Sequence, residues 1–188
     1  MLEDSTASGK NLTCNRFLNS QRSCSLTVDQ RKVERDEANS ILLRLVGQEA
    51  WGANVGFGTL LHVEFGEPMP LGLRGHIRGE WHLSSDFTAW RLDGPAGMIS
   101  GSEDGRETMS GAIQGLNGRQ LESAALIGLS PEATFKFEGG FELRLFPVFS
   151  SEHEHWTLFM PDHMVVVAGP GNEIVIQPAD TPLSSGRQ

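Results

Sequence analysis

The amino-acid sequence predicts a mainly β protein, an antiparallel β-sandwich or barrel with one or two short helices. From residue 51 onward, short runs alternate apolar and polar residues, which is the pattern of strands that bury one face. Glycine-containing turn segments separate these runs, and the chain has 22 glycines among 188 residues. Many short strands joined by such turns are typical of antiparallel sheets rather than of an α/β fold.

The first 36 residues have the composition of a tail. They are rich in Ser, Thr, Asn and Gln, and their apolar residues follow no sustained period, so they bury too little to offset the entropy of ordering them. We expect a flexible tail over 1–36, a single β-rich domain over 37–178 and a disordered tail over 179–188. Cys14 and Cys24 lie in the first tail, where two free thiols are favoured over a disulfide because nothing else indicates an oxidising compartment.

A short helix is predicted from Asp36 to Val46, directly before the first strand. Its apolar residues recur at helical spacing, acidic residues stand at its start, and Gly47 follows its end. A buried strand over 41–46 is the competing interpretation. Farther along, Leu121–Leu129 suits either a second short helix or a further strand.

The predicted strands are short alternations of apolar and polar residues. They are Leu61–Phe65, Trp81–Leu83, Trp90–Leu92, Phe135–Phe137, Phe141–Leu145, Trp156–Leu158, Met164–Val167 and Glu173–Gln177. The tryptophans Trp81, Trp90 and Trp156 are expected to anchor the core. Trp51, before the first strand, is expected at the surface.

Two parts of the chain, 55–95 and 133–170, show a similar order of elements. Trp81 is followed nine residues later by Trp90, and Trp156 is followed nine residues later by Val165, with a turn-like segment inside each pair. We therefore consider that one unit, a strand plus a hairpin, is used twice. Two such copies could form one sandwich or a closed barrel.

The formal net charge of −9 is unevenly distributed. Residues 1–35 hold six basic and four acidic groups, whereas residues 36–188 hold nine basic and twenty acidic groups. Such an acidic domain argues against direct nucleic-acid binding and suits a protein partner with a basic surface, because opposite charges steer association. The candidate partner-binding residues are Glu103, Asp104, Glu152, Glu154 and Trp51.

The location of the protein is expected to be cytoplasmic. No stretch approaches the roughly 18–20 apolar residues of a membrane helix, so we expect no membrane partner. The first residues lack the apolar segment of roughly 7–15 residues that a secretory signal requires.

No motif for catalysis is present, and no cofactor is predicted. The chain has no phosphate-binding loop and no Gly-x-Ser-x-Gly elbow, and its predicted folded region has no cysteine nucleophile. These findings leave an enzymatic activity open but favour a non-enzymatic function.

Histidine is the one residue type whose pattern suggests a metal site. In Glu152-His153-Glu154-His155, the imidazoles of His153 and His155 would share one face of a strand, about 6–7 Å apart, as a start for binding a transition metal. Further ligands could come from His62, His76, His82 and His163. We favour the alternative, a solvated polar loop before Trp156.

Polar residues inside the predicted strands are expected to face solvent. His62 and His82 are each flanked by apolar residues and would lie on the outer side of their strands. Glu64, Glu80 and Glu142 could form an acid–base pair only if two of them met in a cleft. We favour outward-facing carboxylates that blunt association between sheet edges.

Several segments carry a family resemblance. They are Gly79-Glu80-Trp81-His82-Leu83, Ala89-Trp90-Arg91-Leu92, His155-Trp156-Thr157-Leu158-Phe159-Met160-Pro161-Asp162 and Ala168-Gly169-Pro170-Gly171. Over about 50–180 the chain resembles small bacterial β-rich proteins of immunity or defence-accessory type, antidotes encoded beside toxins or phage-defence genes. The resemblance implies a small β domain of a bacterial cytoplasm and carries over no catalytic residue.

Two functions follow as hypotheses. The first is a protein-binding module, an immunity or accessory protein of a toxin or defence system, whose acidic surface occludes the basic cleft of a toxin, a nuclease or a subunit of a defence complex. The alternative is a small-molecule-binding β-barrel, with or without enzymatic activity, whose cavity is lined by Trp and Phe.

Overall fold

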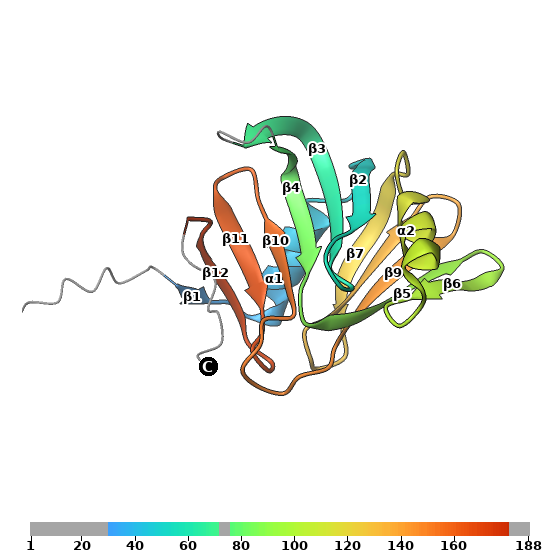
Figure 1. The fold of residues 1–188 in the computed structure, drawn as a ribbon. Coiled ribbons are helices and arrows are strands. Elements are labelled where there is room, and N and C mark those ends of the chain that lie inside the picture. Colours follow the sequence, from blue (N-terminus) through green and yellow to red (C-terminus); the bar gives the residue numbers. More distant parts are fainter. Residues whose placement is uncertain (1–29, 72–75, 181–188) are drawn as a thin grey trace, which may run out of the picture.

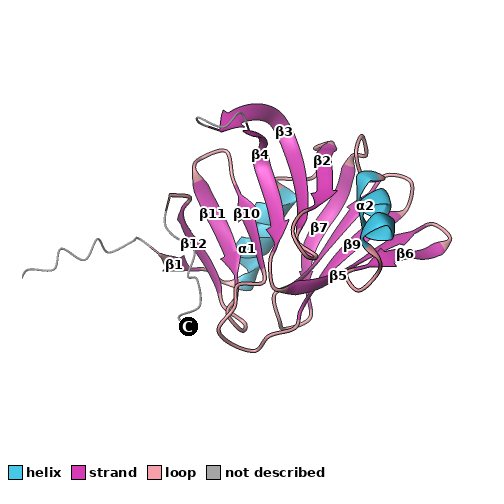
Figure 2. Ribbon diagram, viewed as in Figure 1, coloured by secondary structure: helices cyan, strands magenta, loops and turns pink. Residues whose placement is uncertain are grey.

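The computed structural model describes residues 30–71 and 76–180, and it shows two antiparallel sheets packed against each other (Figure 1, Figure 2). Predictions for Cys14, Cys24 and the chain ends 1–29 and 181–188 lie outside these residues. The elements are β1 (Arg31–Lys32), α1 (Arg35–Leu43), β2 (Ala50–Val55), β3 (Leu61–Leu71), β4 (His76–Ser85), β5 (Thr88–Gly94), β6 (Gly97–Gly101), α2 (Arg106–Gln114), β7 (Leu121–Ile127), β8 (Glu132–Phe137), β9 (Phe141–Pro147), β10 (Trp156–Phe159), β11 (Met164–Ala168) and β12 (Ile174–Pro178).

The first sheet has seven strands in the order β1-β12-β11-β10-β4-β3-β2, and the second has five in the order β6-β5-β9-β8-β7. The mainly β prediction is therefore confirmed, in its sandwich form. The barrel alternative is wrong, because the described strands form two separate sheets that do not close on each other. Near Glu49 and Gln120 a single bridge links the two sheets at one corner.

The core lies between the two sheets and contains the alternating apolar residues. Leu61, Val63 and Phe65 of β3 are fully buried, and the ring of Phe65 stacks on Phe137 of β8 with centroids 6.3 Å apart. This contact joins the two sheets, so their inner faces share one core.

The three strand tryptophans are buried, as predicted. The indole nitrogen of Trp90 donates to the Thr59 carbonyl at 2.9 Å, and that of Trp156 donates to the Pro131 carbonyl at 2.6 Å. Each indole thus buries a large apolar ring while its single N–H stays hydrogen-bonded. Both bonds fix connections between strands at the same end of the sandwich.

The predicted first helix is confirmed as α1, which ends at Leu43 rather than at Val46. Ala38, Ile41 and Leu42 are buried on one side of it, and the Asn39 amide oxygen accepts a hydrogen bond from the backbone N–H of Leu126 in β7. Residues 121–127 form β7, so the strand interpretation of that segment is correct.

The predicted boundary at residue 36 is wrong, because β1 and the start of α1 precede it. Arg31 and Lys32 pair with Ile176 and Val175 of β12, and Val33 is buried. The part of the predicted tail that the structure describes thus joins the edge of the seven-stranded sheet. Backbone hydrogen bonds to β12 stabilise it there, although it has few apolar residues to bury.

The proposed repeat of a strand plus a hairpin is also wrong. Trp156 and Val165 lie on β10 and β11, which form a hairpin. Trp81 and Trp90 lie on β4 and β5, which belong to different sheets. The nine-residue spacing therefore marks a hairpin in one case and a crossing between sheets in the other.

Helix α2 was not predicted. It packs against β2 and β6, and it buries only Met109 and Ile113. Among the described residues, neither helix has the length and apolar character that crossing a membrane would require.

Candidate functional site

Several connections converge at one end of the sandwich, the lower end in Figure 1. Ser85, the last residue of β4, pairs with Leu61 and Trp156, the first residues of β3 and β10. Thr88, the first residue of β5, pairs with Pro147, the last residue of β9. The β2–β3, β4–β5 and β9–β10 connections therefore lie together, and we call this region the loop end.

Exposed apolar side chains gather at the loop end. Phe87, Val148 and Phe149 have exposed fractions of 51%, 60% and 43%. The His153 ring lies against both phenylalanines, stacked on Phe87 with centroids 4.3 Å apart and edge-on to Phe149 at 4.6 Å. We call Phe87, Phe149 and His153 the aromatic cluster, because their three rings contact one another, and Val148 precedes Phe149 beside it.

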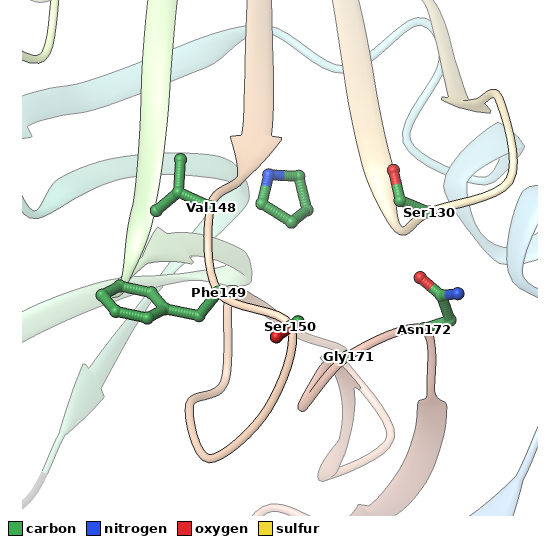
Figure 3. A pocket seen from close by; sticks show the side chains of 7 residues that line it. Ser130, Val148, Phe149, Ser150, Gly171 and Asn172 are labelled. Atoms are coloured by element: carbon green, nitrogen blue, oxygen red, sulfur yellow. The ribbon is translucent and has the colours of Figure 1, made fainter.

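Two surface hollows flank Val148 and Phe149. One, of about 250 Å³, is lined by Phe87 together with the carboxylates of Asp86 and Glu103. The other, of about 320 Å³, is polar on its far side. Figure 3 shows Ser130 and Asn172 across this second hollow from Val148 and Phe149, with the Phe149 ring directed away from them.

Acidic groups surround the aromatic cluster. Glu103 lines the hollow beside Phe87, and Glu152 and Glu154 lie on the β9–β10 connection that carries Phe149. Burial, reinforced by the charge of Glu154, raises the pKa of Asp86 above its usual value. The structure thus brings three of the four acidic candidates to the loop end.

Asp104 and Trp51 have local structural roles. The Asp104 carboxylate accepts hydrogen bonds from the Gly101 N–H and the Ser100 hydroxyl, both at 2.9 Å, and the Gly101 bond is the main reason why its pKa is lowered. Trp51 is half-buried on β2, where its indole nitrogen donates to the Gly66 carbonyl at 2.9 Å. It lies apart from the aromatic cluster.

The two histidines of the Glu-His-Glu-His segment do not share one face. His153 belongs to the aromatic cluster, whereas His155 is fully buried, with Nε2 lying 3.2 Å from the Gly171 carbonyl. Burial lowers the pKa of His155. His163 lies beyond the far end of β10, and the His76 side chain is outside the described part of the chain.

A second site lies on the outer face of the seven-stranded sheet. His62 and Glu64 on β3 and Arg78 and His82 on β4 line a hollow of about 440 Å³ with Asn54, Ile77 and Phe159. We call it the outer-face hollow. The sequence placed His62, Glu64 and His82 on the outer side of their strands, but the expectation that they are solvated is wrong for Glu64, which is only 7% exposed.

Hydrogen bonds hold Glu64 and His82 together. His82 Nδ1 donates to Glu64 Oε1 at 2.7 Å, and the Gly79 N–H donates to Glu64 Oε2 at 2.9 Å. The His82 ring stacks on His62 with centroids 5.3 Å apart, and burial lowers the pKa of His62. Two directly paired strand positions, Glu64 and His82, create this contact.

Arg78 and Phe159 complete the hollow and were not singled out from the sequence. The guanidinium of Arg78 lies over the Phe159 ring, 4.3 Å from its centroid. Arg78, Glu80 and His82 follow one another at intervals of two residues, and this spacing was the available signal, since alternate residues of a strand share one face. Phe159 comes from a strand far along the chain, so only the topology places it here.

The other two carboxylates predicted on strands have ordinary roles. Glu142 accepts hydrogen bonds at 2.8 Å from Arg144 and Thr134, and the bond from Arg144 is the main cause of its lowered pKa. Glu80 accepts a hydrogen bond from the Glu67 N–H at 3.3 Å.

Comparisons with protein-family models, with curated proteins and with solved structures find no match to this chain. The loop end and the outer-face hollow are therefore the two features from which function is inferred.

Proposed function

We propose that this protein is a non-enzymatic binding module that recognises a basic protein partner through its loop end. The observation that carries the proposal is an exposed aromatic cluster flanked by carboxylates. An immunity or accessory role, in which the partner is a basic toxin, a nuclease or a subunit of a defence complex, is the specific form of the proposal that the sequence resemblance suggests.

The apolar part of the loop end has the character of an interface centre. Phe87 and Phe149 are large, and their contacts with His153 limit their conformational freedom before binding. Pre-ordered aromatic side chains lose little entropy on association, and such residues carry much of the binding energy in protein interfaces. Phe57 on the β2–β3 connection adds a phenylalanine that is 92% exposed at the same end.

The charge around this centre favours a basic partner. Asp86 and Glu103 line the hollow beside Phe87, and Glu152 is exposed on the neighbouring connection. The whole of 36–188 has twenty acidic groups against nine basic ones, so its long-range field attracts a positive surface. The acidic rim would disfavour acidic competitors, because like charges repel.

The test begins with the full chain used as bait in an extract of its native host, followed by titration of each purified captured protein. We expect a basic partner whose affinity falls as salt rises, because salt screens the steering charges. Phe149→Ala should raise the dissociation constant about tenfold or more. Glu103→Gln should raise the dissociation constant measured at low salt by a smaller factor.

Matched controls separate the loop end from other exposed residues. Met98→Ala changes an exposed apolar residue on β6, and Glu122→Gln removes an exposed charge on β7. Neither should alter binding. A captured protein that binds Phe149→Ala and Glu103→Gln as tightly as the wild type, or whose binding is insensitive to salt, would overturn the proposal, and so would the recovery of no partner.

A further inference from the structure

We propose that the outer-face hollow is a binding site for a small organic carboxylate. Arg78 would hold the carboxylate, the imidazoles of His62 and His82 would donate hydrogen bonds to it, and Phe159 would contact its apolar part. This site is independent of the loop end, and it takes a different class of ligand from the protein partner proposed above.

Unsatisfied polar atoms are the first observation behind this assignment. Within the described residues, His62 Nδ1 and Arg78 Nε are both buried without a hydrogen-bond partner, and both residues line this hollow. Buried polar atoms are nearly always hydrogen-bonded, so an orphaned pair in one hollow indicates a missing partner. A group that accepts hydrogen bonds satisfies Arg78 Nε, because a guanidinium only donates.

The charge of Arg78 is the second observation. Its guanidinium lies over Phe159, and no ion pair joins it to a carboxylate within the described part of the chain. Glu64, the nearest acid of the hollow, directs its two oxygens to His82 and to the Gly79 N–H. The planar fork of Arg78 matches a carboxylate in size and shape, and such charge-assisted bonds are among the stronger hydrogen bonds in proteins.

The two histidines add neutral or cationic donors. Because His82 Nδ1 donates to Glu64, its Nε2 is the nitrogen left to face a ligand, and Nε2 donates when the ring is protonated. Burial lowers the pKa of His62, which favours a neutral ring that can still donate through one N–H. Glu64 is a positioning residue, since it acts on the ligand only through His82.

The shape of the hollow and its ligating groups narrow the ligand class. The lining includes the guanidinium of Arg78, whose positive charge favours an anionic ligand. A volume of about 440 Å³ lies in the range of small-molecule sites, and Ile77 and Phe159 supply apolar walls. An aromatic or branched carboxylate therefore fits better than a bare inorganic ion.

The test uses benzoate as the probe and follows the imidazole nitrogen signals of the full-length protein by NMR. We expect saturable shifts at His62 and His82, no saturable shifts with the neutral isostere benzamide, and weaker binding of inorganic phosphate. Arg78→Gln should weaken benzoate binding by about tenfold or more, because a charge-assisted hydrogen bond is lost.

Two further variants keep the test decisive. Arg144→Gln removes an arginine from the other sheet and should leave benzoate binding unchanged. Arg78→Lys keeps the charge but loses the fork, so it should bind benzoate with an affinity between those of the wild type and Arg78→Gln. The proposal is overturned if benzoate gives no saturable shift, if benzamide binds equally well, if only phosphate binds, or if both Arg78 variants bind like the wild type.

Discussion

Glu64 is a carboxylate on the outer face of a sheet, yet it is almost fully buried. Its two oxygens accept hydrogen bonds from His82 and from the Gly79 backbone, and these bonds offset the loss of hydration. At the residue scale, the sequence revealed which side of the strand Glu64 occupies. Its partners could not be predicted, because they depend on the β3–β4 register and on a register shift between Phe65 and Pro68.

Glu64→Gln should destabilise the protein by about 1–3 kcal/mol, because an amide cannot accept both hydrogen bonds without leaving its own N–H₂ unpaired. Urea unfolding measures this change, and Glu122→Gln, an exposed carboxylate on β7, should change stability by less than about 0.5 kcal/mol. Glu64→Gln should also remove the preference of His82 for the tautomer protonated at Nδ1, because the carboxylate that accepts this hydrogen bond is gone. An unchanged stability and an unchanged tautomer would contradict this account.

The free energy of unfolding should decrease as pH falls below about 6.5, the usual pKa of histidine. Burial lowers the pKa of both His62 and His155, so the unfolded chain takes up protons that the folded chain does not, and acid favours unfolding. This stability is present above about pH 6.5 and is lost as pH falls from there toward the lowered values.

His62→Gln isolates one of these contributions. The variant should lose less stability than the wild type between pH 7.5 and pH 5.5, a window of about two units around the usual histidine pKa. Asp86, whose pKa is raised, contributes with the opposite sign in both proteins, so it cancels in the difference. Equal pH slopes for the two proteins would contradict the assignment of a lowered pKa to His62.

Glu152 has a φ of 77°, in the left-handed region that favours glycine. Glu152→Gly should therefore leave stability unchanged or raise it by up to about 1 kcal/mol, since relief of strain is offset by the greater freedom of the unfolded chain. Thermal unfolding measures this effect. Glu103→Gly makes the same chemical change at a residue without a positive φ and should give no stabilisation. A clear destabilisation by Glu152→Gly would show that its side chain supports the fold.

At the element scale, spacing predicted α1 but not α2. Helix α1 buries Ala38, Ile41 and Leu42 at regular spacing, whereas α2 buries only Met109 and Ile113. No side chain caps the start of α2, where Gly105 precedes the helix, so capping chemistry gave no signal either. Its position comes from tertiary contacts that a local pattern does not contain.

The β4–β5 link shows why the predicted hairpin was wrong. Two residues, Asp86 and Phe87, separate the strands, a length that suits a hairpin only with positive φ angles at the turn. Neither residue has a positive φ, and the Asp86 N–H donates to the His155 carbonyl at 2.9 Å, outside β5. The link therefore crosses to the other sheet. By contrast, β10 and β11 do form a hairpin, and the connection between them has a positive φ, 58° at His163.

Arg106 at the start of α2 fastens this helix to the β2–β3 connection. Its guanidinium donates to the carbonyls of Val55 at 2.7 Å and Gly58 at 3.1 Å, and also to that of Gly56. Arg106→Ala should destabilise the protein by about 1–3 kcal/mol in urea unfolding. Arg31→Ala, which removes an exposed ion pair with Glu37, should destabilise the protein much less, because solvent screens that pair. Equal losses would contradict a fastening role for Arg106.

At the scale of the whole molecule, the sequence predicted the fold class but not the places where function is proposed. The alternation of apolar and polar residues along a strand is a local property, and the observed sheets bury the apolar residues as this alternation predicts. The aromatic cluster combines Phe87 with Phe149 and His153, and Glu103 approaches it from the segment before α2. These residues lie on three separate segments, so only the topology of the two sheets brings them together.

The sequence predicted the acidic charge of the domain, but it did not predict the exposed phenylalanines or the unpaired donors of the outer-face hollow. An acidic domain was evident from the sequence, and it led to Glu103, Glu152 and Glu154 as candidates. The exposed phenylalanines beside them were not singled out, since apolar residues in connections show no period. The orphaned donors of His62 and Arg78 were likewise outside the reach of a local pattern.

Hydrogen–deuterium exchange of the full chain, with and without its purified basic partner, tests whether the loop end is the recognition surface. We predict slower exchange of backbone amides in 86–89 and 148–155, around the aromatic cluster, with little change in the β5–β6 hairpin at the other end of the sheet. Slower exchange confined to that hairpin or to the outer-face hollow would contradict recognition through the loop end.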